Sequence, residues 1–154
     1  WNVTEREQKP RWTERFTFAD GLKSYYDDVE DNEIEITKGQ FALYTGRTTD
    51  YKNFEKLKQL MKELKISLIH PVNVSDIVMW ELYSYCKMYV TMSLWEGYGR
   101  GVNEASALNK NIVAYDVGAH KRHIKKGICV HLDINNMQKS ESDFKKAVIE
   151  VWSR

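Results

Sequence analysis

From Lys38 onward, the sequence alternates between short apolar runs of strand length and segments in which apolar residues recur at helical spacing. The strand-like runs occupy residues 41–45, 66–70, 88–92, 112–115 and 128–131. The helix-like segments lie at residues 54–64, 75–86, 101–108 and 144–152. Strands separated by helices of about ten residues favour a parallel sheet covered by helices on both faces. We therefore predict an α/β, Rossmann-like domain.

In sheets of this kind, ligands bind beyond the carboxyl ends of the strands, where loops meet the amino-terminal ends of helices. The candidate ligand-binding loops are therefore those that follow Thr45, His70, Met92 and Tyr115. The first and third of these loops combine glycine with charged side chains. Such loops are typical of sites for anions or sugars, because glycine lets the backbone amides approach the ligand.

The length and charge of the chain divide it into two parts. Its 154 residues suffice for one domain but not for two complete catalytic domains. Residues 1–37 hold five basic and ten acidic residues, a balance of −5, and we interpret them as an acidic linker. Residues 38–154 hold 18 basic and 12 acidic residues, a balance of +6, and we interpret them as the Rossmann-like domain. A mildly basic domain suits an anionic ligand.

Several classes of protein are disfavoured. No apolar run approaches the ~18 residues of a membrane span, so no transmembrane segment is predicted. The lysines are spread over several predicted helix faces without interleaved aromatic residues, which argues against a nucleic-acid-binding protein. Cys86 and Cys129 stand far apart and lack a second cysteine at metal-ligand spacing, so neither a zinc site nor a disulfide scaffold is indicated. We expect a cytoplasmic protein.

The loop after the first predicted strand places two cations at the carboxyl edge of the sheet. It runs from Gly46 to Asn53 and contains Arg47 and Lys52. A guanidinium and an ammonium aimed at the same space can hold a diphosphate and neutralise its charge when it leaves. The alternative is a solvated pair of cations beside the start of a helix, and this loop alone favours that alternative.

The loop after the third predicted strand shifts the preference from a solvated pair of cations toward a ligand-binding site. Its candidate ligand-binding residues are Ser93, Glu96, Gly97, Tyr98, Gly99, Arg100, Gly101 and Glu104. Three glycines at alternate positions let the backbone approach a ligand, and the next helix offers its positive amino-terminal end. Each carboxylate can accept hydrogen bonds from two vicinal hydroxyls of a sugar. The glycine spacing does not match G-x-G-x-x-G, so a nicotinamide cofactor is not expected.

The histidines and aromatic residues admit simpler interpretations. His120 and His123 lie one helical turn apart without a carboxylate or thiol at ligand spacing, so we favour a basic surface cluster over a metal site. Contact between a ligand phosphate and a basic side chain at positions 120–122 stays open as an alternative. Trp80 is interpreted as a core residue, as are Tyr83 and Tyr89. Trp95 is a candidate wall of a ligand pocket.

The motifs together resemble the donor-binding, carboxyl-terminal domain of retaining, glycogen-synthase-like group 1 glycosyltransferases, which have two Rossmann domains in the GT-B fold. Glu96-Gly97-Tyr98-Gly99, followed by Glu104, resembles their E-x7-E motif. Gly46-Arg47 with Lys52 resembles their diphosphate loop, and Ser93 resembles the serine ahead of the E-x7-E motif. Residues 104–108 and 113–118 resemble the following helix and the strand with its glycine turn.

The resemblance implies a site for a UDP-, GDP- or ADP-linked sugar. Arg47 and Lys52 would bind the diphosphate and Glu96 the hydroxyls of the transferred hexose, with these three taking part in catalysis. Glu104 would bind the ribose, the amides from Gly97 to Gly101 would complete the site, and residues 71–74 would lie near the base. Transfer would retain the anomeric configuration and use fixed positive groups instead of a metal or another cofactor. The chain contains no Asp-x-Asp.

Two departures from the family pattern stand out. Asn109 replaces a glycine that commonly ends the preceding helix, and asparagine tolerates the left-handed conformation required there. Residues 119–123, Ala-His-Lys-Arg-His, replace the usual Gly-x-Pro-Glu near the transferred sugar.

The resemblance also implies a partner domain. We expect residues 1–37 to be the remnant of an interdomain connection in a longer polypeptide. The missing amino-terminal domain would bind the acceptor and could make any peripheral membrane contact. The isolated chain would bind the donor without efficient transfer. The alternatives are a non-catalytic nucleotide-sugar-binding module and a fragment of a two-Rossmann sugar epimerase or phosphorylase.

Overall fold

The computed structural model describes residues 15–17, 33–35, 38–72 and 74–154. Most of the predicted acidic linker at residues 1–37 therefore lies outside the described residues. Within that segment, strand β1 (Arg15–Thr17) pairs antiparallel with strand β2 (Glu33–Glu35) in a separate two-stranded sheet. This pair was not predicted: polar and apolar residues alternate in both segments, but each strand is only three residues long, below the four to eight residues over which alternation indicates a strand.

The main sheet has five strands, all parallel, in the order β4-β3-β5-β6-β7. Its strands are β3 (Ala42–Leu43), β4 (Leu68–Ile69), β5 (Met88–Thr91), β6 (Asn111–Tyr115) and β7 (Gly127–Val130). The order changes direction between β3 and β5, which places the start of the crevice typical of doubly wound sheets beside β3. The predicted Rossmann-like α/β fold is confirmed.

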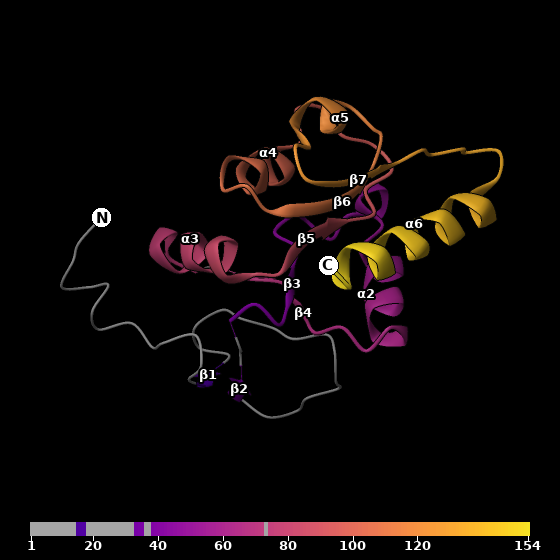
Figure 1. Ribbon diagram of the computed structural model, residues 1–154. Helices are drawn as coiled ribbons and strands as arrows, with labels where there is room; N and C mark the ends of the chain where they lie inside the picture. Colours follow the sequence, from indigo (N-terminus) through magenta and orange to yellow (C-terminus); the bar gives the residue numbers. More distant parts are fainter. Residues whose placement is uncertain (1–14, 18–32, 36–37, 73) are drawn as a thin grey trace.

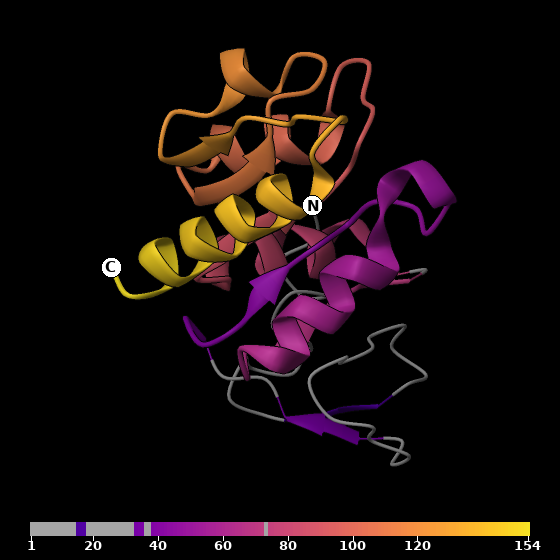
Figure 2. The ribbon, with the colours of Figure 1, turned by 90° about the vertical axis from the view of Figure 1, so that its right-hand side faces the viewer.

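Helices cover both faces of this sheet, as Figure 1 and the rotated view in Figure 2 show. Helices α3 (Asp76–Tyr85) and α4 (Arg100–Ala107) pack on one face, and α2 (Phe54–Glu63) and α6 (Met137–Trp152) pack on the other. Strand side chains alternate between the two layers: Tyr89 and Ile112 face α3 and α4, whereas Val90 and Val113 face α2 and α6. Both faces are therefore apolar, which explains the continuous apolar runs in the sequence.

Local capping signals set the helix boundaries. The Ser75 hydroxyl accepts a hydrogen bond from the backbone N–H of Val78 at 3.3 Å, so α3 begins where a serine N-cap predicts. Asn109, beyond the end of α4, adopts φ 57°, the left-handed conformation expected from its replacement of glycine. Asn136 caps α6 by accepting from the N–H of Lys139 at 3.1 Å.

Two short helices were not predicted. A 3₁₀ turn, η2 (Asp50–Lys52), precedes α2, and helix α5 (His120–His123) follows β6. Each is a single turn, too short for apolar periodicity to reveal it. Both lie at the carboxyl edge of the sheet, so they position side chains there that the sequence pattern assigned to loops.

Candidate functional site

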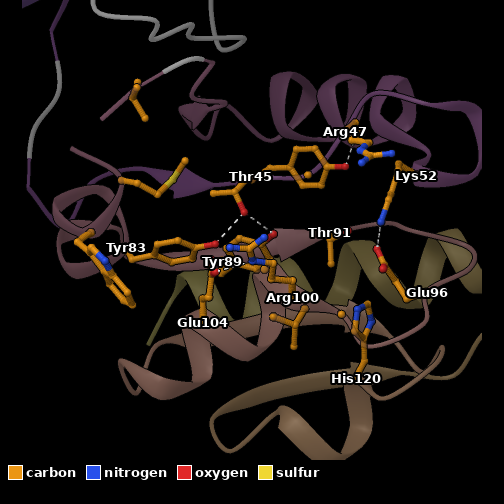
Figure 3. A pocket seen from close by; sticks show the side chains of 18 of the residues that line it. Thr45, Arg47, Lys52, Tyr83, Tyr89, Thr91, Glu96, Arg100, Glu104 and His120 are labelled. Carbon is orange, nitrogen blue, oxygen red and sulfur yellow. Dashed lines mark hydrogen bonds and ion pairs between the residues drawn. The ribbon is translucent and has the colours of Figure 1, made fainter. Parts of the chain in front are cut away.

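A pocket of about 660 Å³ lies at the carboxyl edge of the main sheet, and Figure 3 shows it from close by. All four candidate ligand-binding loops contribute to its lining: the first through Thr45, Gly46, Arg47, Tyr51 and Lys52, the second through Val74, the third through Glu96, Gly99, Arg100 and Gly101, and the fourth through His120. Of the predicted site residues, the pocket is lined by Gly46, Arg47, Lys52, Glu96, Gly99, Arg100, Gly101 and Glu104. The structure thus brings together residues that are separated by up to 58 positions, from Gly46 to Glu104, in the sequence.

The loop after β3 is held in shape from its own strand. The Tyr44 hydroxyl donates to the carbonyl of Arg47, and a Cβ atom at Gly46 would overlap the Tyr44 ring. His70, at the end of β4, is hydrogen-bonded through Nε2 to the Gly46 carbonyl at 2.9 Å. The loop is therefore fixed at its base, while the Arg47 side chain extends from an exposed position at the pocket.

Lys52 and Glu96 form an ion pair across the pocket, joining the loop after β3 to the loop after β5 (Figure 3). Their side chains are only 15% and 14% exposed. A second link comes from the backbone, where the N–H of Leu94 donates to the carbonyl of Tyr51 at 2.8 Å. The predicted cation and the predicted sugar-binding carboxylate are thus direct neighbours, partly shielded from water.

The glycine-rich loop packs tightly on the turn after β6. Gly118 has φ 54°, and a Cβ atom there would collide with the carbonyls of Glu96 and Gly97. The N–H of Ala119 donates to the carbonyl of Gly97 at 3.2 Å. Glycine is required at position 118 because the two loops approach with no space for a side chain. The contact fixes the backbone that carries Glu96.

Glu104 lies at the other end of the pocket, beside a group of hydroxyls. Thr45 Oγ1 shares hydrogen bonds with the hydroxyls of Tyr83 at 2.8 Å and Tyr89 at 3.1 Å. Glu104 faces the Tyr83 hydroxyl and accepts a hydrogen bond from Arg100 Nε at 3.1 Å. Burial raises the pKa of Tyr89 to about 12, so this phenol keeps its proton at neutral pH.

The rings of Tyr83 and Tyr89 belong to the core, as predicted, and are stacked with centroids 5.9 Å apart. Their hydroxyls nevertheless reach the pocket lining, which was not predicted from the sequence. A tyrosine buried beneath a polar pocket can supply hydroxyl groups to its floor while its ring packs in the core. The pocket floor between Lys52 and Glu104 is therefore neutral and polar.

Three predicted donor-binding residues do not line the pocket. Ser93 is fully buried and donates through Oγ to the carbonyl of Trp95 at 3.0 Å, a bond that shapes the turn. Gly97 faces the turn after β6, and Tyr98 is exposed and packs edge-on against His123. Their predicted contacts with a donor stay predictions.

Three interpretations of individual side chains need correction. His120 is buried and lines the pocket, so its assignment to a basic surface cluster was wrong. Trp80 is 43% exposed and also lines the pocket, so it is not a core residue. Trp95 is 65% exposed, does not line the pocket, and instead packs edge-on against Tyr51. A histidine immediately after a strand and a glycine turn was the available signal for His120.

Metal-ligand clusters and membrane-spanning helices can be assessed for the described ranges, 15–17, 33–35, 38–72 and 74–154. There, no three His, Cys, Asp or Glu side chains are grouped as metal ligands would be. No helix in this part of the chain is both long and apolar enough to cross a membrane. The pocket is the best-defined candidate site in these ranges.

Comparison with known proteins adds two findings. Residues 67–150 match the sequence profile of the family described as glycosyl transferases group 1. Comparison with curated protein sequences gives no match.

Two solved structures share the fold. One is the crystal structure of a GtfA/B complex, with a TM-score of 0.56 and 16% identity over 76% of this chain. The other is the pneumococcal O-GlcNAc transferase GtfA in complex with UDP and GlcNAc, with a TM-score of 0.55 and 17% identity over 75% of this chain. At these identities the likeness concerns the fold alone. This chain spans only 30% and 29% of the two proteins.

The fold and the family profile agree. The Rossmann-like sheet resembles one half of a GT-B glycosyltransferase, and its pocket lies where doubly wound sheets bind ligands. The profile covers β4 to α6, which is more than half of the 154 residues and includes Glu96 and Glu104. This chain belongs to the group 1 glycosyl transferases.

Proposed function

We propose that this chain is the carboxyl-terminal, donor-binding domain of a retaining, glycogen-synthase-like glycosyltransferase, which transfers a hexose from a nucleoside diphosphate sugar. The observation that supports this proposal best is the convergence of Arg47, Lys52, Glu96 and Glu104 on one pocket from three separate segments. Two cations and two carboxylates at separate places suit a ligand that is anionic in one part and rich in hydroxyls in others.

The cations would bind the diphosphate. Arg47 is exposed at the pocket and free to turn toward a ligand, whereas Lys52 is held by its neighbour Glu96. A guanidinium binds two phosphate oxygens at once, and an ammonium adds a compact charge. The first turn of α4 also points its backbone N–H groups toward the pocket through Gly99 to Gly101, which favours an anion.

The carboxylates would bind hydroxyl groups on either side of the diphosphate. Glu96 would accept from the hydroxyls of the transferred hexose, and Glu104 from those of the ribose. Support for this assignment comes from their positions, because Glu96 lies beside Lys52 while Glu104 lies beside Tyr83 at the other end of the pocket. Val74, Met79 and Trp80 add apolar surface to the pocket lining, and Trp80 lies beside Tyr83, the neighbour of Glu104, which suits a nucleobase.

Transfer with retention would break the bond between the anomeric carbon and the diphosphate oxygen, and form a bond from that carbon to an acceptor hydroxyl oxygen on the same face, with the acceptor's proton passing to the leaving diphosphate. Negative charge then develops on the leaving diphosphate, and Arg47 and Lys52 would stabilise it as fixed positive groups in place of a metal. Fixed groups need no reorganisation during the reaction. The bond from Leu94 to Tyr51 and the Lys52–Glu96 pair support such rigidity on the Lys52 side.

Efficient transfer would need an acceptor-binding domain that these residues do not contain. The solved glycosyltransferase structures that this chain matches are more than three times as long as the region they share with it. The proposed activity of this chain alone is therefore donor binding, with hydrolysis or transfer well below that of a two-domain enzyme.

Calorimetric titration of the chain with UDP, GDP, ADP and their glucose conjugates tests the proposal. One nucleotide series should bind at micromolar to millimolar concentration. Arg47→Ala and Glu104→Ala should each weaken binding by about tenfold or more, since each removes a charge-assisted hydrogen bond. Lys56→Ala, a matched change on the exposed part of α2 outside the pocket, should leave binding unchanged.

The proposal is contradicted if no probe binds at millimolar concentration. Equal affinities in wild type, Arg47→Ala and Glu104→Ala would also contradict it, since binding would then occur elsewhere. Far-UV circular dichroism of each variant separates a lost contact from a lost fold.

A further inference from the structure

His120 occupies an unusual position for a histidine in this chain. It begins α5, directly after the Gly118 turn, and its side chain is buried yet lines the pocket beside Glu96 (Figure 3). Its Nδ1 lies 3.0 Å from the carbonyl oxygen of Tyr115. A carbonyl oxygen can only accept, so the Nδ1 atom carries the proton and donates it to this bond.

The other ring nitrogen is therefore the atom available to a ligand. Burial lowers the pKa of His120, opposed by the Tyr115 carbonyl and Glu96 and assisted by Lys52 and His123. The imidazole is thus neutral at neutral pH, and with Nδ1 protonated its Nε2 is a bare acceptor. Across the described ranges 38–72 and 74–154, Nε2 has no hydrogen-bond partner.

The backbone next to this nitrogen places no side chain over it. Gly99, in the left-handed conformation with φ 75°, packs against the ring, and a Cβ atom there would lie 2.9 Å from Nε2. A side chain at position 99 would cover this edge of the ring. Glycine at position 99 therefore keeps this edge of the ring free of a covering side chain, on a residue that lines the pocket but is only 1% exposed.

We infer that His120 is a specificity-determining residue of the donor site, whose Nε2 accepts a hydrogen bond from a hydroxyl or amide N–H of the transferred sugar. This inference rests on the proposed function. The same atom is unsuited to the diphosphate, because phosphate oxygens and a bare imidazole nitrogen are both acceptors. His120 would thus distinguish sugars by the position of a donor group, next to the hydroxyls that Glu96 accepts.

Two substitutions separate this role from a purely structural one. His120→Asn places an amide N–H near the position of Nδ1, where it can still donate to Tyr115, but has no atom at the position of Nε2. His120→Gln extends an amide toward the position of Nε2. His131→Asn, at an exposed position outside the pocket, is the matched control.

The experiment compares calorimetric titrations of the chain with UDP, GDP and ADP and with UDP-glucose, UDP-GlcNAc, GDP-mannose and ADP-glucose. For the sugar nucleotide that binds wild type, His120→Asn should weaken binding about fivefold, as expected for one lost hydrogen bond. Its affinity for the matching bare nucleotide should stay within about twofold. His120→Gln should recover most of the loss, and His131→Asn should change neither affinity.

A second measurement needs no substitution at His120. In long-range ¹⁵N spectra of the wild-type imidazoles, a resonance of an unprotonated Nε2 should shift when the sugar nucleotide binds and stay in place with the bare nucleotide. This readout applies even if His120→Asn does not fold.

The outcomes distinguish the inference from the proposed function. The inference is overturned, while donor binding stands, if His120→Asn weakens binding of the bare nucleotide and of the sugar nucleotide equally, or weakens binding of neither, and the Nε2 resonance does not shift when the sugar nucleotide binds. If no nucleotide or sugar nucleotide binds wild type, the proposed function fails and the inference fails with it.

Discussion

Glu96→Gln is expected to change the affinities for two related ligands in opposite directions. Glu96 is paired with Lys52, the cation proposed to bind the diphosphate. The substitution removes a negative charge close to the phosphates and releases the ammonium from its partner. It also removes a charged acceptor for the hexose hydroxyls. A bare nucleoside diphosphate should therefore bind more tightly than it binds wild type, and the corresponding sugar nucleotide should bind more weakly.

The magnitude follows from the geometry of the pair. A phosphate that contacts Lys52 lies on the order of 6 Å from the Glu96 carboxylate, since both would touch the same ammonium. Repulsion between two unit charges at that distance is about 0.7 kcal/mol in water and about 2.8 kcal/mol at an effective dielectric constant of 20. The pocket edge is open and screened by salt. We therefore expect about 1 kcal/mol, or about fivefold tighter binding of the bare nucleotide.

The binding free energy lost at the sugar is larger than the binding free energy gained at the phosphates. A hydrogen bond to a charged group contributes about 1.5–3 kcal/mol, so losing the carboxylate should weaken binding of the hexose by about tenfold or more. The ratio of the two dissociation constants, sugar nucleotide over bare nucleotide, should rise by at least that factor. This ratio cancels any effect on the nucleotide that both ligands share.

Calorimetry with the nucleotide that binds wild type most tightly, and with its glucose conjugate, measures both constants. Glu63→Gln is the matched control, because Glu63 forms an exposed ion pair with Lys145 outside the pocket. A folded Glu96→Gln protein that binds the bare nucleotide no more tightly than wild type would refute the electrostatic reasoning. An unchanged ratio of the two constants would refute the role of Glu96 in binding the sugar.

Three further predictions concern the domain itself. Phe144→Ala, at a fully buried position of α6, should lower the free energy of unfolding in urea by about 3–5 kcal/mol, whereas Ile149→Ala on the exposed side should cost less than about 1 kcal/mol. Gly118→Ala should lower the free energy of unfolding by about 2 kcal/mol or more, because φ is positive at this position and the glycine-rich loop leaves no space for a Cβ atom. Thermal unfolding measures this, and a wild-type melting temperature for the variant would contradict it. Burial raises the pKa of Cys129 to about 11 and that of Cys86 to about 12, so both thiols should carry far less thiolate at pH 8 than a free cysteine. Mass spectrometry should show iodoacetamide labelling of both thiols far slower than in urea, and equal rates would count against their burial.

The fold was predictable because its signals are local. Each long helix has an apolar stripe or a cap that can be read from neighbouring residues, such as Ser75 ahead of α3. The main strands are continuous apolar runs because helices cover both faces of the sheet. The exact extent of a strand was less predictable: the run 41–45 pairs as β3 only over Ala42–Leu43, although Tyr44 still donates to Ile69 at 3.1 Å.

The site was predictable only where its residues stand in a recognisable motif. Arg47, Lys52 and Glu104 line the pocket as their motifs indicated. His120 and Trp80 were misjudged, because their exposure depends on segments distant in sequence. His120 is buried by the glycine-rich loop packed against it. Trp80 lies on the side of α3 that is next to the pocket instead of the sheet, a distinction that an apolar helix does not reveal from its own sequence.

The distribution of charge in the pocket favours a nucleoside diphosphate sugar over a simple polyanion. A polyanion site would gather cations without carboxylates, because each carboxylate repels the ligand. Here Glu96 neutralises Lys52 at one end and Glu104 is paired with Arg100 at the other, while neutral tyrosine and threonine hydroxyls lie in between. Because these carboxylates weaken phosphate binding, they favour binding only of a ligand whose hydroxyl groups they contact. The same logic explains a neutral histidine at position 120: a charged one would attract the phosphate, whereas a bare nitrogen accepts only from a donor group such as those of a sugar.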